Sequence, residues 1–279
     1  MERTRFVTAL FLGLFALAVL FWLPAPMLVT LMLVMAGMSA WEWGGLLGTD
    51  YRAPRLGMLV LSAGIGGGLL MIGRMQADIP LCAFLVITGG VWWCAFSVYL
   101  YYHLHQISGE SRHRRDSLWS AGAGLLVLIP GFGALICLTV EGQRFLLSAL
   151  IFLVATTDSC AYLCGKRWGR HQMAPVISPG KTWEGAIGGL AGAVVTALII
   201  ALIAADDKGL FLWLGIGLMV APFSMIGDLT VSYFKRRSGI KDTGRLLPGH
   251  GGMLDRIDGI LGAVSVYMIA LSMLGWNIL

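Results

Sequence analysis

Residues 118–140 read LWSAGAGLLVLIPGFGALICLTV, a stretch without a charged side chain. An α-helix needs about 20 apolar residues to cross a hydrocarbon core about 30 Å thick, so this stretch is long enough to span a membrane. Comparable apolar windows recur along the whole chain. We predict nine transmembrane helices, at residues 6–23, 26–41, 56–73, 79–100, 118–140, 144–164, 184–205, 210–231 and 259–276.

The composition of the chain agrees with a membrane-embedded fold. Of its 279 residues, 57% are apolar and only 13% are charged, and the mean hydropathy is +0.80. A soluble domain has about 25% charged residues, so much of this protein's surface must face lipid. The expected fold class is all-α, a polytopic transmembrane helical protein. We expect the first window to be retained as a helix, because its apolar run exceeds the usual core of a signal peptide.

The basic residues gather on one side of the predicted membrane. With nine helices, one face carries the N-terminus and the loops near 42–55, 101–117, 165–183 and 232–258. All but three of the 20 lysines and arginines lie on this face, the exceptions being Arg74, Arg144 and Lys208. Cytoplasmic loops carry such an excess, so we predict that the N-terminus is cytoplasmic and the C-terminus lies outside. The net charge of +5 then reflects orientation and anionic headgroups, and no nucleic-acid partner is indicated.

The five cysteines fall inside predicted helices, at Cys82, Cys94, Cys137, Cys160 and Cys164. No pair lies in an outer loop, so we expect no disulfide framework. Cys160 and Cys164 are four residues apart on one helix and allow a metal site. The favoured interpretation is that they are small residues packing between helices.

The two halves of the chain differ in character. Residues 1–150 form predicted N-terminal transmembrane helices joined by modest loops, and the basic loop 101–117 is expected to be a solvated turn. Residues 151–279 form a predicted C-terminal catalytic region with cytoplasmic active-site loops. In that region four glycines have small-xxx-small spacing, which lets helices approach closely. They are Gly185, Gly188, Gly189 and Gly192.

Four acidic residues lie in or beside helices of the second region, where such residues are costly and mark functional sites. Asp158 and Asp228 lie near the cytoplasmic ends of the sixth and eighth helices. Asp255 and Asp258 open the ninth helix at positions i and i+3, on one helix face. We therefore expect all four carboxylates to approach the same membrane face at similar depth. If each acid only anchored the end of its own helix, the occurrence of all four on one membrane face would be poorly explained.

Hydroxyl, basic and glycine residues accompany these acids. Ser224, Asp228, Ser232 and Lys235 repeat at helical spacing, and a second cytoplasmic segment, residues 177–185, reads ISPGKTWEG. Mg²⁺ binds through a few carboxylates plus substrate phosphates, and basic groups neutralise charge on a phosphoryl group in transfer. The mixture predicts a site where a nucleotide and a lipid phosphate meet at the membrane interface.

At these residues the chain resembles the phosphatidate cytidylyltransferase (CDP-diacylglycerol synthase) family. The resemblance is carried by residues 232–258, SYFKRRSGIKDTGRLLPGHGGMLDRID, together with Gly227, Asp228 and residues 178–185. It implies a membrane-embedded nucleotidyltransferase that converts CTP and phosphatidic acid to CDP-diacylglycerol and pyrophosphate with Mg²⁺. It also implies a homodimer and room for a second cation. The short chain and compact loops suggest a multi-pass protein of the cytoplasmic (inner) membrane, and the distribution of basic residues predicts an active site on its cytoplasmic face.

The same resemblance implies roles for individual side chains. The expected metal ligands are Asp228, Asp255 and Asp258, with Asp158 as a further candidate. The expected catalytic residues are Asp228, Lys241, His250, Asp255 and Asp258, and His250 would bind phosphate or orient the nucleophile. The expected substrate-binding residues are Ser178, Lys181, Thr182, Ser232, Lys235, Arg236 and Arg256.

Three other classes of protein are alternatives. A structural membrane protein is one, but it gives no reason for the density of lysine, aspartate and glycine within residues 232–258. A CTP-dependent polyprenol or lipid kinase would use a similar site but transfer the γ-phosphate. A cation transporter would also place acids within helices. Transporter sites usually lie near the middle of the membrane, whereas these acids are predicted at one end of their helices.

Overall fold

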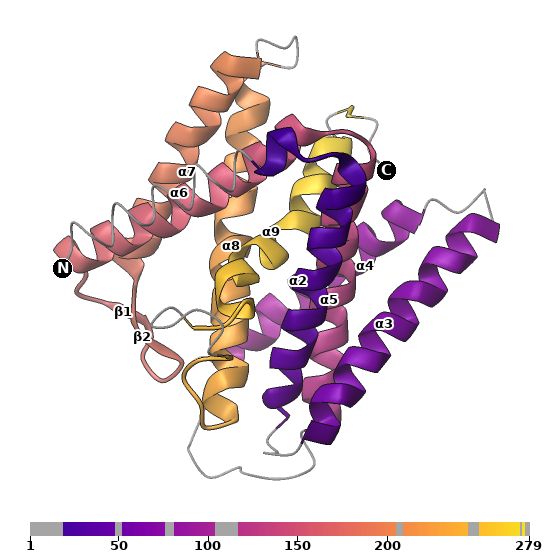
Figure 1. Cartoon of the computed structure of the whole chain (residues 1–279). Helices are drawn as coiled ribbons and strands as arrows, with labels where there is room; N and C mark the ends of the chain where they lie inside the picture. The colour runs from indigo at the N-terminus through magenta and orange to yellow at the C-terminus, as the bar shows by residue number, and fades with distance from the viewer. Residues whose placement is uncertain are drawn as a thin grey trace.

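The computed structural model of the chain describes residues 19–47, 52–75, 81–103, 117–204, 209–244, 251–273 and 275–276. Within these residues the chain forms long helices and one small hairpin (Figure 1). In chain order the elements are α2 (Ala25–Gly45), α3 (Arg52–Met75), α4 (Leu81–His103), α5 (Ser117–Val140), α6 (Arg144–Trp168), β1 (Gln172–Ala174), β2 (Ser178–Thr182), α7 (Trp183–Ala204), α8 (Leu210–Arg237) and α9 (Leu254–Met273).

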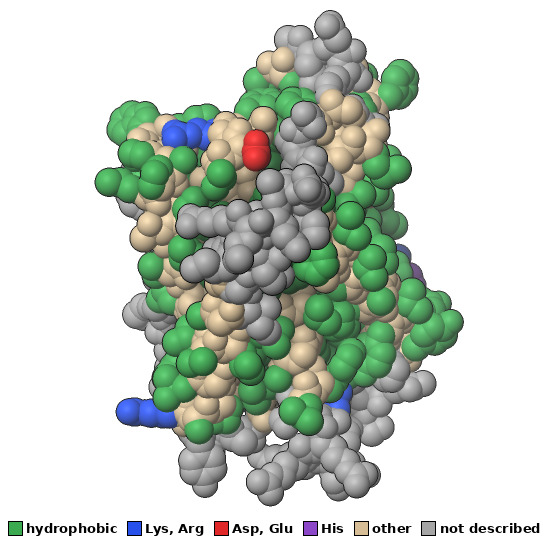
Figure 2. Space-filling model, turned by 90° about the vertical axis from the view of Figure 1, so that its right-hand side faces the viewer, with side chains coloured by type: hydrophobic (Ala, Val, Ile, Leu, Met, Phe, Trp, Pro, Cys, Tyr) green, Lys and Arg blue, Asp and Glu red, His purple; other side chains and the backbone are tan. Residues whose placement is uncertain are grey.

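Seven helices of the described chain are long and apolar enough to cross a membrane, namely α2 and α4 to α9. They coincide with seven of the predicted windows, and hydrophobic side chains cover most of the described surface in Figure 2. The protein is therefore polytopic and almost entirely helical. The predicted helix at 56–73 is present as α3 but is not among these seven. The predicted helix at 6–23 lies mostly outside the described residues.

The all-α expectation misses the antiparallel hairpin β1–β2, which connects α6 to α7. Its register pairs Gln172 with Thr182 and Ala174 with Ser178. The strands are too short to show the alternation of apolar and polar residues that identifies a strand in a sequence. Arg236, near the end of α8, donates from Nε to the carbonyl oxygen of Ile177 at 3.0 Å, and this bond holds the hairpin turn against α8.

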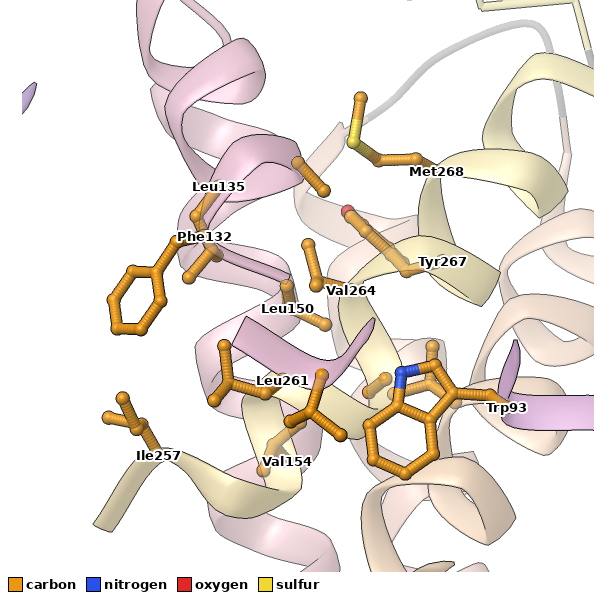
Figure 3. Packing of buried hydrophobic residues seen from close by; sticks show 14 of the residues in the cluster. Trp93, Phe132, Leu135, Leu150, Val154, Ile257, Leu261, Val264, Tyr267 and Met268 are labelled. Atoms are coloured by element: carbon orange, nitrogen blue, oxygen red, sulfur yellow. The ribbon is translucent and has the colours of Figure 1, made fainter. Parts of the chain in front are cut away.

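Helix α9 lies at the centre of the core. Figure 3 shows its side chains Leu261, Val264 and Tyr267 among residues of α4, α5 and α6. The hydroxyl of the fully buried Tyr267 donates to the carbonyl oxygen of Leu146 at 2.9 Å. Because α9 also contacts α2 and α8, one hydrophobic core joins the two predicted regions of the chain. The predicted boundary at residue 150 falls within α6.

The predicted close approach of helices at the glycines is confirmed between α6 and α7. A Cβ atom added at Gly188 would lie 2.4 Å from Cys164 Sγ, and one at Gly192 would lie 2.6 Å from Cys160 Sγ. Real Cβ atoms do not approach so closely, so the glycines allow the two helices to pack. Cys160 and Cys164 therefore act as packing residues, as the sequence favoured.

The prediction of no disulfide was wrong. Cys82 in the first turn of α4 and Cys137 in the last turn of α5 form a disulfide bond. The prediction considered only loop cysteines, whereas these two lie within helices whose ends meet. The beginning of α5 lies beside α2, because the indole N–H of Trp43 donates to the carbonyl oxygen of Ser120 at 2.8 Å. The disulfide and Trp43 thus mark opposite ends of α5.

Candidate functional site

Polar side chains from five elements converge around the C-terminal half of α8 and the first turns of α9. They form two groups, one around Asp228 and one around Asp255. The positions follow from helix geometry, since Asp228 precedes the end of α8 by nine residues, or about 14 Å at 1.5 Å per residue. Asp255 and Asp258 lie in the first two turns of α9.

The Asp228 cluster consists of Asp158 of α6, Lys181 of β2, Asp228 and Ser232 of α8, and Asp258 of α9. Lys181 Nζ lies 2.7 Å from Asp228 Oδ2, and Ser232 Oγ donates to Asp228 Oδ1 at 3.2 Å. Asp158 and Asp258 each interact electrostatically with this ion pair. Lys181 therefore forms its ion pair with Asp228, and two further acidic side chains lie close enough to interact with that pair.

Glycines bring the two acid-bearing helices together. A Cβ atom at Gly227 would lie 2.3 Å from the carbonyl oxygen of Asp258, and one at Gly262 would lie 2.4 Å from that of Phe223. Only glycine fits where the backbones of α8 and α9 approach this closely. The residue after Gly227 is Asp228, so the close crossing itself sets Asp228 beside Asp258.

The Asp255 cluster consists of Glu42 of α2, Lys235 of α8, Thr243, Gly252 and Asp255. Lys235 Nζ lies 2.8 Å from Asp255 Oδ1. The backbone N–H groups of Thr243 and Gly252 each donate to Asp255 Oδ2 at 3.0 Å. Asp255 is thus held on both oxygens by groups of the protein, and Lys235 also interacts electrostatically with Asp258 of the Asp228 cluster.

Glu42 was not identified from the sequence, although it is buried in the centre of the Asp255 cluster. It accepts hydrogen bonds from the backbone N–H groups of Met253 at 2.9 Å and Leu254 at 2.8 Å. The hydroxyl of Thr243 lies 2.9 Å from Glu42 Oε2 and 3.0 Å from Asp255 Oδ2. One hydroxyl proton therefore serves two carboxylates, and Glu42 ties α2 to the start of α9.

A signal for Glu42 was present in the sequence. It follows directly on the predicted helix at 26–41, and an acid beside a membrane helix is the criterion that selected the other carboxylates. Two contacts hold the C-terminal end of α2, where Glu42 lies, against α8. The rings of Trp43 and Phe234 lie 5.2 Å apart, and the hydroxyl of Ser238 donates to the carbonyl oxygen of Leu46.

The remaining predicted residues lie in different settings. Thr182 caps α7, because its Oγ1 accepts the N–H of Gly185 at 3.1 Å, which is the usual bond of an N-terminal cap. Ser178 opens β2 in the hairpin that Arg236 holds. Lys241 and Arg256 are exposed. His250 lies outside the described residues, as do the basic side chains of the loop that was expected to be a solvated turn, Arg112, His113, Arg114 and Arg115.

The donor atoms of the Asp228 cluster fit a hard divalent cation such as Mg²⁺. The carboxyl groups of Asp228 and Asp258 offer hard oxygen ligands. The hydroxyl of Ser224, one turn before Asp228, is buried and has no hydrogen-bond partner within the described chain. No group of three or more acidic, histidine or cysteine side chains in the described part forms a ready metal cage. Asp255 in particular faces Lys235 rather than the other two predicted ligands.

A complete cage of protein ligands is not required for Mg²⁺ where a phosphate substrate is also bound. Mg²⁺ is usually bound by one or two carboxylates, with the rest of its shell supplied by water and substrate phosphates. Lys181 pairs with Asp228 and Lys235 pairs with Asp255, and both ammonium groups are of the kind that binds phosphate oxygens. The site is therefore equipped to bind an anionic, phosphate-bearing substrate at the end of a helical membrane bundle.

Comparison with known proteins gives consistent matches along the chain. The model of the cytidylyltransferase family matches residues 3–274. A Pseudomonas aeruginosa protein named phosphatidate cytidylyltransferase is 34% identical over 280 residues, covering 99% of both chains. Proteins of the same name from Haemophilus influenzae and Staphylococcus aureus are each 43% identical over 131 residues. The first of these alignments covers 44% of each chain, and the second covers 47% of this chain and 50% of the relative.

Proposed function

The chain belongs to the cytidylyltransferase family, and we propose that it is a phosphatidate cytidylyltransferase. It converts CTP and phosphatidic acid to CDP-diacylglycerol and pyrophosphate in phospholipid synthesis. One observation assigns this function to a site. It is the ion pair between Lys181 and Asp228, which lies where α8 and α9 cross closely and beside Asp258.

The reaction requires positioning and charge neutralisation more than covalent chemistry by the protein. An oxygen of the lipid phosphate attacks the α-phosphorus of CTP and forms the new phosphoanhydride bond. The bond from the α-phosphorus to the oxygen that leads to the β-phosphorus breaks, and pyrophosphate leaves with the electron pair. The attacking oxygen is already ionised near neutral pH, so the reaction needs no general base.

The described lysines suit the phosphate groups of both substrates. Lys181 pairs with Asp228 of α8, and Lys235 of α8 pairs with Asp255 of α9. Charged donors that meet developing negative charge stabilise a transition state strongly. We assign Lys181, Lys235 and Arg236 to phosphate binding, with Lys241, His250 and Arg256 as further candidates.

Asp228 and Asp258 are the residues that we assign to Mg²⁺, with Asp158 as a neighbour that adds negative charge. When bound, the ion would neutralise phosphate oxygens of CTP and of the leaving pyrophosphate. Asp255 is assigned a different part, since it orders Lys235 and the backbone at Thr243 and Gly252. A second cation and a homodimer remain part of the proposal, to be tested by metal analysis and by cross-linking in membranes.

The proposed topology has nine transmembrane helices, a cytoplasmic N-terminus and a cytoplasmic active site. The excess of lysine and arginine in the loops on the side of the site supports this orientation. The disulfide between Cys82 and Cys137 supports it too, because disulfides persist in oxidising compartments and this one lies at the other end of α5 from Trp43 and Glu42. CTP from the cytoplasm would then meet phosphatidic acid at the membrane interface.

The decisive experiment is an assay of the purified protein in detergent with phosphatidic acid, Mg²⁺ and CTP labelled in the cytidine. We expect label to enter the lipid phase and pyrophosphate to be released, both dependent on phosphatidic acid. ATP and dCTP serve as comparators. Formation of free CDP and a newly phosphorylated lipid would instead identify a CTP-dependent lipid kinase. No lipid-dependent product from a folded sample would refute both.

A further inference from the structure

An apolar groove of about 370 Å³ lies beside the Asp228 cluster. It is lined by side chains of α4, α7 and α8 together with Met173 of β1. Its size falls within the range of about 300–1,000 Å³ that is typical of ligand pockets. Most of its lining side chains are aliphatic, including Leu100 of α4, Ile187 and Leu190 of α7, and Leu229 of α8.

The groove begins at the candidate catalytic site. Met225 lines it, and the carbonyl oxygen of the same residue accepts a hydrogen bond from Lys181 Nζ at 3.3 Å. Leu229, which also lines it, directly follows Asp228 in the chain. The Lys181 ammonium group, which pairs with Asp228, is therefore near the groove at Met225.

The groove opens to the side of the bundle, towards lipid. Tyr101 and Trp183 lie on its lining and are 69% and 53% exposed, and Ile187 is 68% exposed. Exposed tyrosine and tryptophan are typical of the level at which headgroups meet the hydrocarbon core. Trp183 begins α7 directly after the strand that carries Lys181, so the aromatic rim and the ion pair belong to the same end of the protein.

The chemistry of the lining selects the kind of occupant. The cytosine, ribose and triphosphate of CTP need polar partners, and the groove offers only the hydroxyls of Ser97 and Tyr101 and the indole N–H of Trp183 among its side chains. The Ser97 hydroxyl already donates to the carbonyl oxygen of Cys94 at 2.8 Å. An alkyl chain satisfies such a lining, and a lipid with a phosphate headgroup satisfies both the lining and Lys181.

We propose that this groove binds one acyl chain of phosphatidic acid and so sets the lipid phosphate against Lys181 and Asp228. The inference rests on the proposed function for the identity of the lipid. Lipid tails are as apolar as the groove, so burial by itself provides little affinity. The groove instead positions the reacting phosphate, and misplacement of about 1 Å can cost a factor of about 100 in rate.

Two substitutions on α7 test this role as a matched pair. Ile187→Trp fills the groove, whereas Ile199→Trp places the same side chain at a half-exposed isoleucine that does not line it. For Ile187→Trp we expect kcat/KM for dioleoyl phosphatidate to fall by about tenfold or more, with the KM for CTP unchanged. For Ile199→Trp we expect the kinetics of the unsubstituted protein. Equal kinetics of both variants and the unsubstituted protein would overturn the proposal.

Photo-cross-linking gives a readout that does not depend on turnover. Phosphatidic acid with a diazirine in one acyl chain should label Ile187, Leu190 or Met225, and unlabelled phosphatidic acid should abolish the labelling. Labelling that phosphatidylcholine competes away equally well would identify a structural membrane lipid and overturn the proposal. Specific labelling in a protein that forms no CDP-lipid would leave the groove assignment intact and refute the proposed reaction instead.

Discussion

The substitution Glu42→Gln separates the charge of Glu42 from its shape. The carboxylate accepts the N–H of Met253 on Oε1 and the N–H of Leu254 on Oε2. A glutamine has one carbonyl oxygen, so in either amide orientation one of these N–H groups faces an NH₂ group. A backbone donor left without an acceptor costs about 1–3 kcal/mol. Loss of a negative charge at the N-terminus of α9 adds about 0.3–1 kcal/mol.

These contributions give an expected cost of about 1–4 kcal/mol for the docking of α2 against the start of α9. Thr243 links Glu42 to Asp255, and Asp255 pairs with Lys235. The substitution should therefore disturb the position of Lys235 as well. A loss of about 1.4 kcal/mol corresponds to a factor of ten, so we expect kcat/KM for CTP to fall by at least about tenfold. The thermal unfolding midpoint should fall as well.

The assay is steady-state kinetics in detergent at saturating phosphatidic acid, together with thermal unfolding of the same samples. Glu42→Asp keeps the charge and should restore part of the activity. Glu141→Gln is the matched control, since Glu141 follows α5 at its exposed far end. A lower unfolding midpoint with unchanged kinetics would show that Glu42 only stabilises the fold. Unchanged kinetics and unchanged stability would refute the reasoning altogether.

Two further predictions concern the Asp228 cluster and the disulfide. Asp228→Asn and Asp258→Asn should each reduce turnover by at least about a hundredfold while leaving the protein in the membrane, because each replaces a carboxylate that we assign to Mg²⁺ with a weaker, neutral ligand. Activity near normal in both, measured as labelled CDP-lipid, would contradict the metal assignment. Cys82→Ser should destabilise the protein by about 2–4 kcal/mol without loss of activity, and dithiothreitol should bring the unsubstituted protein to the same unfolding midpoint. A midpoint that is unaffected by either treatment would show that Cys82 and Cys137 are not linked in the purified protein.

Much of the fold could be predicted from the sequence because a membrane helix is identified by a local property. The windows at 118–140 and 144–164 correspond closely to α5 and α6. The same is true of the carboxylates at Asp228 and Asp258, because an acid near the end of an apolar helix is conspicuous wherever it lies. The structure brings these two together at the glycine crossing, as expected from their position on one membrane face.

The features that were missed depend on contacts between distant parts of the chain. Glu42 and its partner Leu254 are 212 residues apart, so no local pattern connects them. The disulfide depends on how α4 and α5 pack, which the separate helices do not reveal. Asp255 was grouped with Asp258 because both lie on one face of α9, yet Lys235 and Thr243 hold its side chain. Spacing along a helix indicates a shared face but not which neighbours a side chain meets.

The groove between α4 and α7 opens sideways, towards lipid. This opening lowers the free energy needed to bring a water-insoluble substrate to the site. Moving an alkyl chain into water costs about 0.8 kcal/mol per CH₂ group, so withdrawing one sixteen-carbon chain from the bilayer would cost roughly 11 kcal/mol. A chain that slides laterally past Ile187 and Leu190 stays among hydrocarbon throughout. Substrate and product can then exchange by diffusion within the membrane plane, and only the phosphate and the nucleotide need to meet water.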